Sequence, residues 1–197
     1  MNTWPRLSAT VIMGCILLIT GCSSPDRQGA PGNKKEKTDM NMQEAAERAD
    51  AMLDATFSAI KPEVNWAHGP TTAGSCDVSR RRTVMTIISK ERRGSFLGVI
   101  ERHWRSHGFR ITEVNKSEKF PAIFAKTRDG FGISLTIGGG GQAFFEVATP
   151  CVTESEVADP TAKPNGPSYE DVYPVPRPNV RSEFWSSNDP LSETPKN

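Results

Sequence analysis

The sequence lacks an excess of charge of either sign and is short of apolar segments. Its 197 residues carry 24 lysines and arginines against 23 aspartates and glutamates. Nucleic-acid-binding proteins normally carry a basic surplus, so this balance argues against that class. Only 36% of the residues are hydrophobic, with a single apolar run, whereas a polytopic membrane protein needs several runs of about 20 residues. The length is that of one domain with tails.

Short catalytic motifs are also missing. The sequence contains no G-x-S-x-G, H-E-x-x-H or C-x-x-C motif, and it has only three histidines. The glycine run 138–141 lacks the lysine and the following helix of a phosphate-binding loop, and it is typical of a hairpin turn. We therefore expect no cofactor, no metal site and no enzymatic activity.

The N-terminus has the features of an export signal. Arg6 is the only charged residue before Asp26, and the largely apolar run 7–20 that follows Arg6 has 14 residues. A membrane-spanning helix needs roughly 20 residues. A short basic region followed by a short apolar region is instead typical of a signal peptide, which we place at residues 1–21.

The residues Ile19-Thr20-Gly21-Cys22 resemble the bacterial lipobox. The resemblance implies that the Cys22 thiol carries a diacylglyceryl group, that the chain is cleaved before Cys22, and that some bacteria also acylate the new N-terminus. Two acyl chains give stable anchoring to a membrane. The alternatives are an uncleaved signal anchor or a Cys22 that merely follows an ordinary signal, while Cys15 would leave too short an apolar region.

Composition divides the rest of the chain into three parts. Residues 22–39 are rich in small polar and charged residues and are predicted to be a flexible tether, followed by a folded domain at 40–151. Residues 152–197 contain eight of the 15 prolines and are predicted to be a Pro-rich disordered tail. Four aromatic residues of this tail either pack onto the domain, dock onto a partner or stay inert: Tyr169, Tyr173, Phe184 and Trp185.

Cys15 belongs to the predicted signal peptide and Cys22 to the lipobox, which leaves two further cysteines. Cys76 and Cys151 lie in the predicted domain, and two cysteines in an exported chain most simply form a disulfide. A pair of free thiols, or half of a metal site, are the alternatives. A bridge would join the segment before the first main strand to the end of the last strand.

Periodicity predicts two helices and five strands between residues 40 and 151. Asn41 and Glu44 form a capping-box pattern before an apolar-periodic helix that Pro62 ends. Ser89 can cap a second helix that runs to His107. The fold class is therefore α+β: a two-layer sandwich of two helices packed on a mainly antiparallel sheet of about five strands, with disordered N- and C-terminal arms. The strands are predicted at 82–89, 109–115, 122–128, 131–137 and 142–149.

Three local patterns are candidate sites, and each has a structural alternative. His103 and His107 lie on the same side of the second helix, where they either chelate a metal or are plain surface histidines. Trp66 and His68 either line a pocket or, for the tryptophan, close the core. A basic region either contacts anionic wall polymer or lipid headgroups or forms a solvated rim. Its members are Arg80, Arg81, Arg82, Lys90, Arg92 and Arg93.

The second half of the predicted domain resembles small lipoproteins of high-GC Gram-positive bacteria. The resemblance implies lipidation and a shared domain, and it supplies no activity or catalytic residues. The motifs that carry it are Arg102-His103-Trp104, His107-Gly108-Phe109, Pro121-Ala122-Ile123-Phe124-Ala125, Asp129-Gly130-Phe131 and Thr149-Pro150-Cys151-Val152.

These features favour a non-enzymatic binding or interaction domain that is lipid-anchored through Cys22 on the outer face of the cytoplasmic membrane. Its expected partners are the membrane itself and an envelope protein or cell-wall component, and no nucleic acid. The alternative is an envelope enzyme or metal-dependent accessory protein that uses His68, His103 or His107 with nearby carboxylates.

Overall fold

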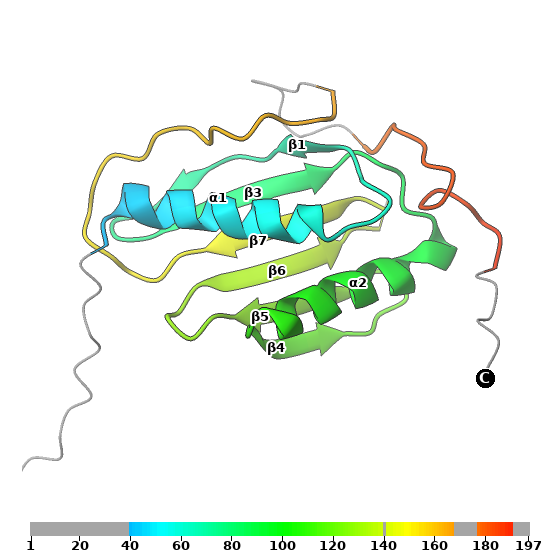
Figure 1. Ribbon diagram of the computed structural model, residues 1–197, viewed down its shortest axis with the longest axis horizontal. Helices are drawn as coiled ribbons and strands as arrows, with labels where there is room; N and C mark the ends of the chain where they lie inside the picture. Colours follow the sequence, from blue (N-terminus) through cyan, green and yellow to red (C-terminus); the bar gives the residue numbers. More distant parts are fainter. Residues whose placement is uncertain (1–39, 140, 168–176, 191–197) are drawn as a thin grey trace, which may run out of the picture. The chain divides into compact units, whose positions relative to one another are not determined.

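Two helices lie on one face of an antiparallel sheet (Figure 1). The computed structural model describes residues 40–139, 141–167 and 177–190, so the predicted signal peptide and tether lie outside the described residues. The predicted α+β two-layer sandwich is confirmed. The elements are α1 (Met42–Ser58), β1 (Trp66–His68), β2 (Thr72–Ala73), β3 (Val78–Val84), a 3-10 turn η1 (Lys90–Arg92), α2 (Arg93–Ser106), β4 (Arg110–Asn115), β5 (Ala122–Lys126), β6 (Gly132–Ile137) and β7 (Ala143–Ala148).

The helix α1 begins at the predicted capping box. The Asn41 side chain accepts a hydrogen bond from the Glu44 backbone N–H at 3.0 Å, and the Glu44 carboxylate accepts one from the Asn41 backbone N–H at 2.9 Å. These two bonds satisfy backbone donors that a helix start leaves unpaired. Apolar residues then recur on the face that meets the sheet, and the three alanines among them let the helix approach the strands closely. They are Met42, Ala45, Ala46, Ala49, Leu53 and Phe57.

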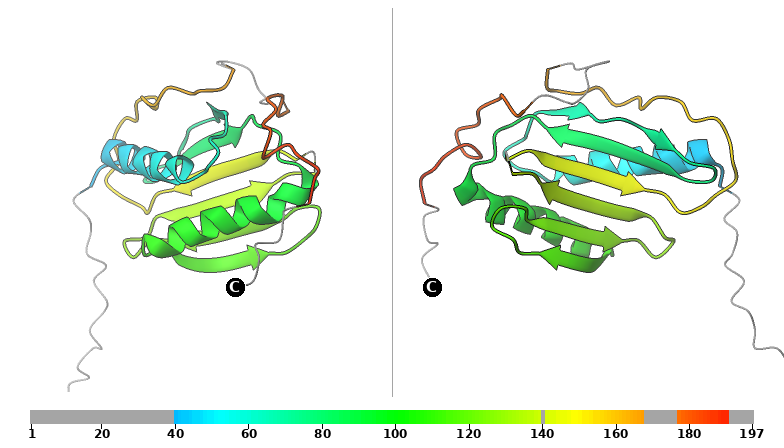
Figure 2. Two further views of the ribbon diagram at one scale, coloured as in Figure 1. Left: turned by 45° about the vertical axis from the view of Figure 1, so that its right-hand side comes forward. Right: turned by 180° about the vertical axis from the view of Figure 1, so that it is seen from behind.

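The sheet has the strand order β1-β3-β7-β6-β5-β4, with β2 paired to β3, and every pairing is antiparallel. Its seven strands exceed the expected five because β1 and β2 have only three and two residues, too short to show a periodic pattern. On β6, Ile133, Leu135 and Ile137 are buried under the helices, and Ser134 and Thr136 face the other way. Seen from behind, that second face carries no helix (Figure 2).

Two predicted boundaries were wrong. The first main strand is Val78–Val84 instead of 82–89, because the chain leaves the sheet after Val84 and pairs with the C-terminal segment. There the Ile87 N–H donates to the Val180 carbonyl at 2.8 Å. Ser89 does not cap α2, since its hydroxyl donates to the Ser187 carbonyl and a 3-10 turn comes before the helix.

The C-terminal segment contacts the domain at several places, although composition predicted a disordered tail over 152–197. Trp185 is 1% exposed, and its indole N–H donates to the Pro62 carbonyl at 2.6 Å. Its ring meets the ring of Phe96 edge-on at 5.2 Å. Phe184 and Trp185 therefore pack onto the domain, which was one of the three alternatives, while Tyr169 and Tyr173 lie outside the described residues.

Another contact of the C-terminal segment covers the outer edge of β1. The Gly166 N–H donates to the Trp66 carbonyl at 3.1 Å, and the Asn165 side chain accepts from the Trp66 N–H at 2.9 Å. A Cβ at Gly166 would come within 2.8 Å of that carbonyl oxygen, so the close approach requires glycine. The unpaired backbone groups of an exposed edge strand can pair with another chain, and this segment covers those of Trp66 on β1.

The predicted disulfide between Cys76 and Cys151 is present, with the two Cα atoms 4.8 Å apart. The Val152 N–H also donates to the Cys76 carbonyl at 2.7 Å. The bridge lies where β3 starts and β7 ends, next to the paired residues Ser79 and Ala148. It therefore joins the neighbouring strands β3 and β7 at one end of the sheet.

Truncating the buried indole tests the docking of the tail. We expect Trp185→Ala to lower the free energy of unfolding by about 3–5 kcal/mol, because it leaves a cavity against Phe96 and an unpaired Pro62 carbonyl. Asp189→Ala, at an exposed position four residues later, should change it by less than about 0.5 kcal/mol. Urea denaturation measures both, and equal stability of the two variants would show that the tail does not dock in solution.

Candidate functional site

Half of the predicted basic region is buried inside the protein. Arg80, Arg82 and Arg92 are 2%, 1% and 5% exposed. The two interpretations from the sequence, an anion-contacting surface and a solvated rim, are therefore both wrong for these three residues. Strand alternation explains the pattern, because Arg80 and Arg82 point to the helix face of β3 and Arg81 points to the face without helices.

Acidic residues of α1 pair with two of these three buried arginines, Arg80 and Arg82. Arg80 pairs with Asp50 at 3.2 Å, and it also donates to the Thr71 hydroxyl and the Ala158 carbonyl, each at 2.6 Å. Arg82 donates to Asp54 at 2.6 Å.

Burial shifts the titration of this cluster. It raises the pKa of Asp50 above its ordinary value, and the positive charges of Arg80 and Arg82 offset the rise only in part. Burial likewise lowers the pKa of Arg82, against the hydrogen bond and the charge of Asp54. The cluster therefore has the contacts of a structural ion-pair network between α1 and β3.

Trp66 closes the core under its loop. It is 7% exposed, its ring lies 5.6 Å from that of Phe57, and the Arg82 guanidinium stacks 4.0 Å above it. His68, the other residue of this candidate pocket, contacts the Ala162 carbonyl through its Nε2 atom at 2.7 Å. These contacts favour the structural interpretation of the Trp-His string.

The two helical histidines lie side by side at the end of α2. Their ring centroids are 4.1 Å apart, and Nδ1 of His107 contacts the His103 carbonyl oxygen at 2.8 Å. Burial, and then the charge of His107, lowers the pKa of His103 below its ordinary value. His68 lies on β1, and the described residues contain no group of three or more His, Cys, Asp or Glu side chains placed to hold a metal.

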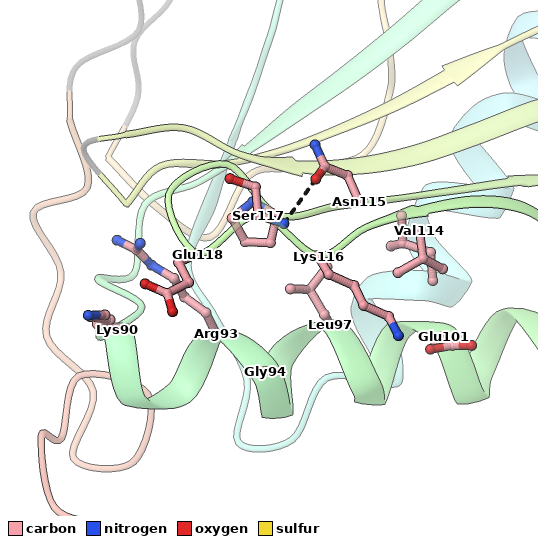
Figure 3. A pocket seen from close by; sticks show the side chains of 12 residues that line it. Lys90, Arg93, Gly94, Leu97, Glu101, Val114, Asn115, Lys116, Ser117 and Glu118 are labelled. Carbon is pink, nitrogen blue, oxygen red and sulfur yellow. Dashed lines mark hydrogen bonds between the residues drawn. The ribbon is translucent and has the colours of Figure 1, made fainter.

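A pocket of about 410 Å³ lies between the start of α2 and the loop after β4 (Figure 3). Its floor is apolar: Leu97 comes from α2, Val114 from β4, and Pro121 and Ile123 from the start of β5. Val114 is 42% exposed, so part of this apolar floor is open to solvent. An open apolar floor of this size is typical of a ligand site.

Charged groups surround this floor. Lys90, Arg93 and Glu118 gather at one end of the pocket, and Lys116 lies farther along the helix (Figure 3). Glu101 also lines the pocket, but its carboxylate is already paired with Arg105 at 2.7 Å. The Nε atom of Arg93 is buried and has no hydrogen-bond partner within the part of the chain that the structure describes. The pocket thus offers an apolar floor with hydrogen-bond donors at its rim.

The pocket and the entry of the chain lie at opposite ends of the sheet. The chain enters α1 at Asn41, which bridges to Thr153 beside the disulfide. The pocket lies at the other end, where α2 begins and β4 ends (Figure 1). Sequence analysis missed it because its floor combines three elements whose apolar residues look like ordinary core positions.

Comparisons with known proteins give one distant similarity. No protein-family model and no curated protein matches the chain. The crystal structure of a DUF4853 family protein from Actinomyces odontolyticus, a high-GC Gram-positive bacterium, is similar with a TM-score of 0.33 and 10% identity, over 67% of this chain and 80% of that one. This similarity assigns no family, ligand or activity to the chain.

Replacing Arg80 tests the buried ion-pair network. We expect Arg80→Leu to cost about 3 kcal/mol of unfolding free energy, because Asp50 keeps its burial and loses its nearest counter-charge. Arg105→Leu breaks an exposed pair and should cost no more than about 0.5 kcal/mol. Denaturation of both variants at neutral pH measures the contrast.

The cost of Arg80→Leu should also depend on pH. A carboxyl with a raised pKa stabilises the fold while it is protonated, and that contribution is lost as the pH rises through the raised pKa. Removing Arg80 raises the pKa of Asp50 further, so the cost should be larger at pH 7 than at pH 4. A cost that does not change with pH would contradict the pairing with Asp50.

Proposed function

We propose that the chain is a membrane-anchored extracytoplasmic lipoprotein whose domain is a non-enzymatic binding or interaction module. The disulfide indicates an extracytoplasmic protein, since disulfides form and persist in oxidising compartments. Anchoring rests on the lipobox-like residues that end at Cys22. Within the described residues, neither helix combines the length and apolar character needed to cross a bilayer.

The observation that carries the binding role is the position of the apolar pocket. The described chain begins next to Asn41, at the end of the sheet opposite to Leu97 and Val114, so the point of attachment leaves the pocket uncovered. An anchored module that captures a partner needs a binding surface that its point of attachment does not occupy. The alternative role, an envelope enzyme or metal-dependent accessory protein, gains no support from geometry because His68 lies on β1 and His103 and His107 lie at the end of α2.

Anchoring is tested with two cysteine variants expressed in a bacterium that processes lipoproteins. Cys22→Ser should move the protein from the membrane fraction to the soluble fraction and abolish labelling by a radioactive fatty acid, because the acceptor thiol is gone. Cys15→Ser is the matched control and should leave both properties unchanged. Membrane retention of the Cys22→Ser protein would contradict lipid anchoring.

The pocket is tested by in-cell cross-linking and pull-down of the anchored protein. Val114→Arg places a long charged side chain in the pocket at an exposed position, so folding should persist while partner recovery falls at least about tenfold. Thr112→Arg adds the same side chain at an exposed position of the same strand outside the pocket. Equal recovery by Val114→Arg and the wild type would remove the pocket from the proposed function.

A further inference from the structure

The sheet face without helices is a second hollow surface, distinct from the apolar pocket. It forms a groove of about 760 Å³ over β3, β7, β6 and β5, bounded on one side by the loop at Gly69 and Pro70. Figure 2 shows this face from behind with no helix over it. We propose that the groove binds a neutral glycan chain of the cell envelope. The proposal deepens the binding role, yet it rests on residues that the apolar pocket does not use.

Strand register arranges the groove in two rows that cross the strands. One row runs Arg81, Glu146, Ser134, Phe124, and the next contains Thr83, Phe144 and Thr136. Neighbouring strands lie about 4.8 Å apart, so the first row spans roughly 14 Å. The surface is therefore long enough to follow a chain of several sugars.

The charges at one end of the groove are paired with each other. Arg81 donates to Glu146 at 2.7 Å, and its other contacts are the Pro70 carbonyl at 3.1 Å and the Thr72 hydroxyl at 2.7 Å. Both side chains stay partly exposed, 30% for Arg81 and 39% for Glu146. Arg81 and Glu146 can therefore hydrogen-bond to hydroxyl groups of a bound sugar while they remain paired with each other. A charged ligand would have to compete with the partner of one group and meet the like charge of the other.

The rest of the groove offers hydrogen-bonding groups and exposed aromatic carbon. No hydrogen bond within the described residues engages the side chains of Ser134, Thr136 or Gln142, so these groups are free for a ligand. Phe144 is 40% exposed and Phe124 is half-buried. A sugar presents hydroxyls around its rim and C–H groups on its faces, and an aromatic ring packs against such C–H groups.

Binding is tested with the full-length chain purified in detergent. Calorimetric titration uses two neutral tetrasaccharides, chitotetraose and cellotetraose, and tetragalacturonate, which has the same length and a carboxylate on every sugar. We expect at least one neutral tetrasaccharide to bind, and the charged one to bind at least about tenfold more weakly. Phe144→Ala should weaken neutral binding about tenfold, and Thr136→Val, which keeps the shape and removes the hydroxyl, about fivefold.

Phe120→Ala is the matched control, since Phe120 is 49% exposed and lies outside the groove. It should leave binding unchanged. The proposal is overturned if no neutral tetrasaccharide binds, if Phe144→Ala and Thr136→Val bind as the wild type does, or if the charged tetrasaccharide binds as tightly. A dimer that Phe144→Ala dissociates would also overturn it, because a second copy then covers this face. None of these results bears on Cys22 or Val114, so failure here is separable from failure of the proposed function.

Discussion

The arrangement of the two layers depends on the ion pairs that join α1 to β3. Arg80 and Arg82 are two residues apart on a strand, and Asp50 and Asp54 are four residues apart on a helix. Two strand residues span about 6.6 Å and four helical residues about 6 Å, so the two pairs form together when the helix runs alongside the strand. A shift of α1 by one turn would leave a buried guanidinium without a carboxylate, so the pairs fix the helix position along the sheet as apolar contacts alone cannot.

Local sequence signals predicted the elements whose stabilising contacts are themselves local. The capping box at Asn41 and the alternation on β6 were read correctly because each is visible within a few residues. Gly108, with φ of 77°, ends α2 as a left-handed residue that few other side chains tolerate. The fold class followed from these elements and from the order in which they occur.

The features that sequence reasoning missed depend on partners far along the chain. Sequence alone predicts Arg80 at the surface, because the carboxylate that pairs with it belongs to Asp50, 30 positions earlier in the chain. The run after Val84 reads as a strand because its apolar residues suit one, yet it pairs with Val180. Likewise Trp185 lies in a proline-rich segment that cannot form a core of its own, and it is buried only because Phe96 and Pro62 leave a place for it.

The C-terminal segment also determines which surfaces of the described domain stay open to ligands. Gly166 occupies the outer edge of β1, and Trp185 closes the gap between the loop after α1 and the start of α2. The helices cover one face of the sheet. The apolar pocket at Val114 and the groove at Phe144 are both hollows of the described surface. They lie on opposite sides of the sheet and differ in chemistry, so the proposed glycan and the proposed apolar partner would not compete for the same surface.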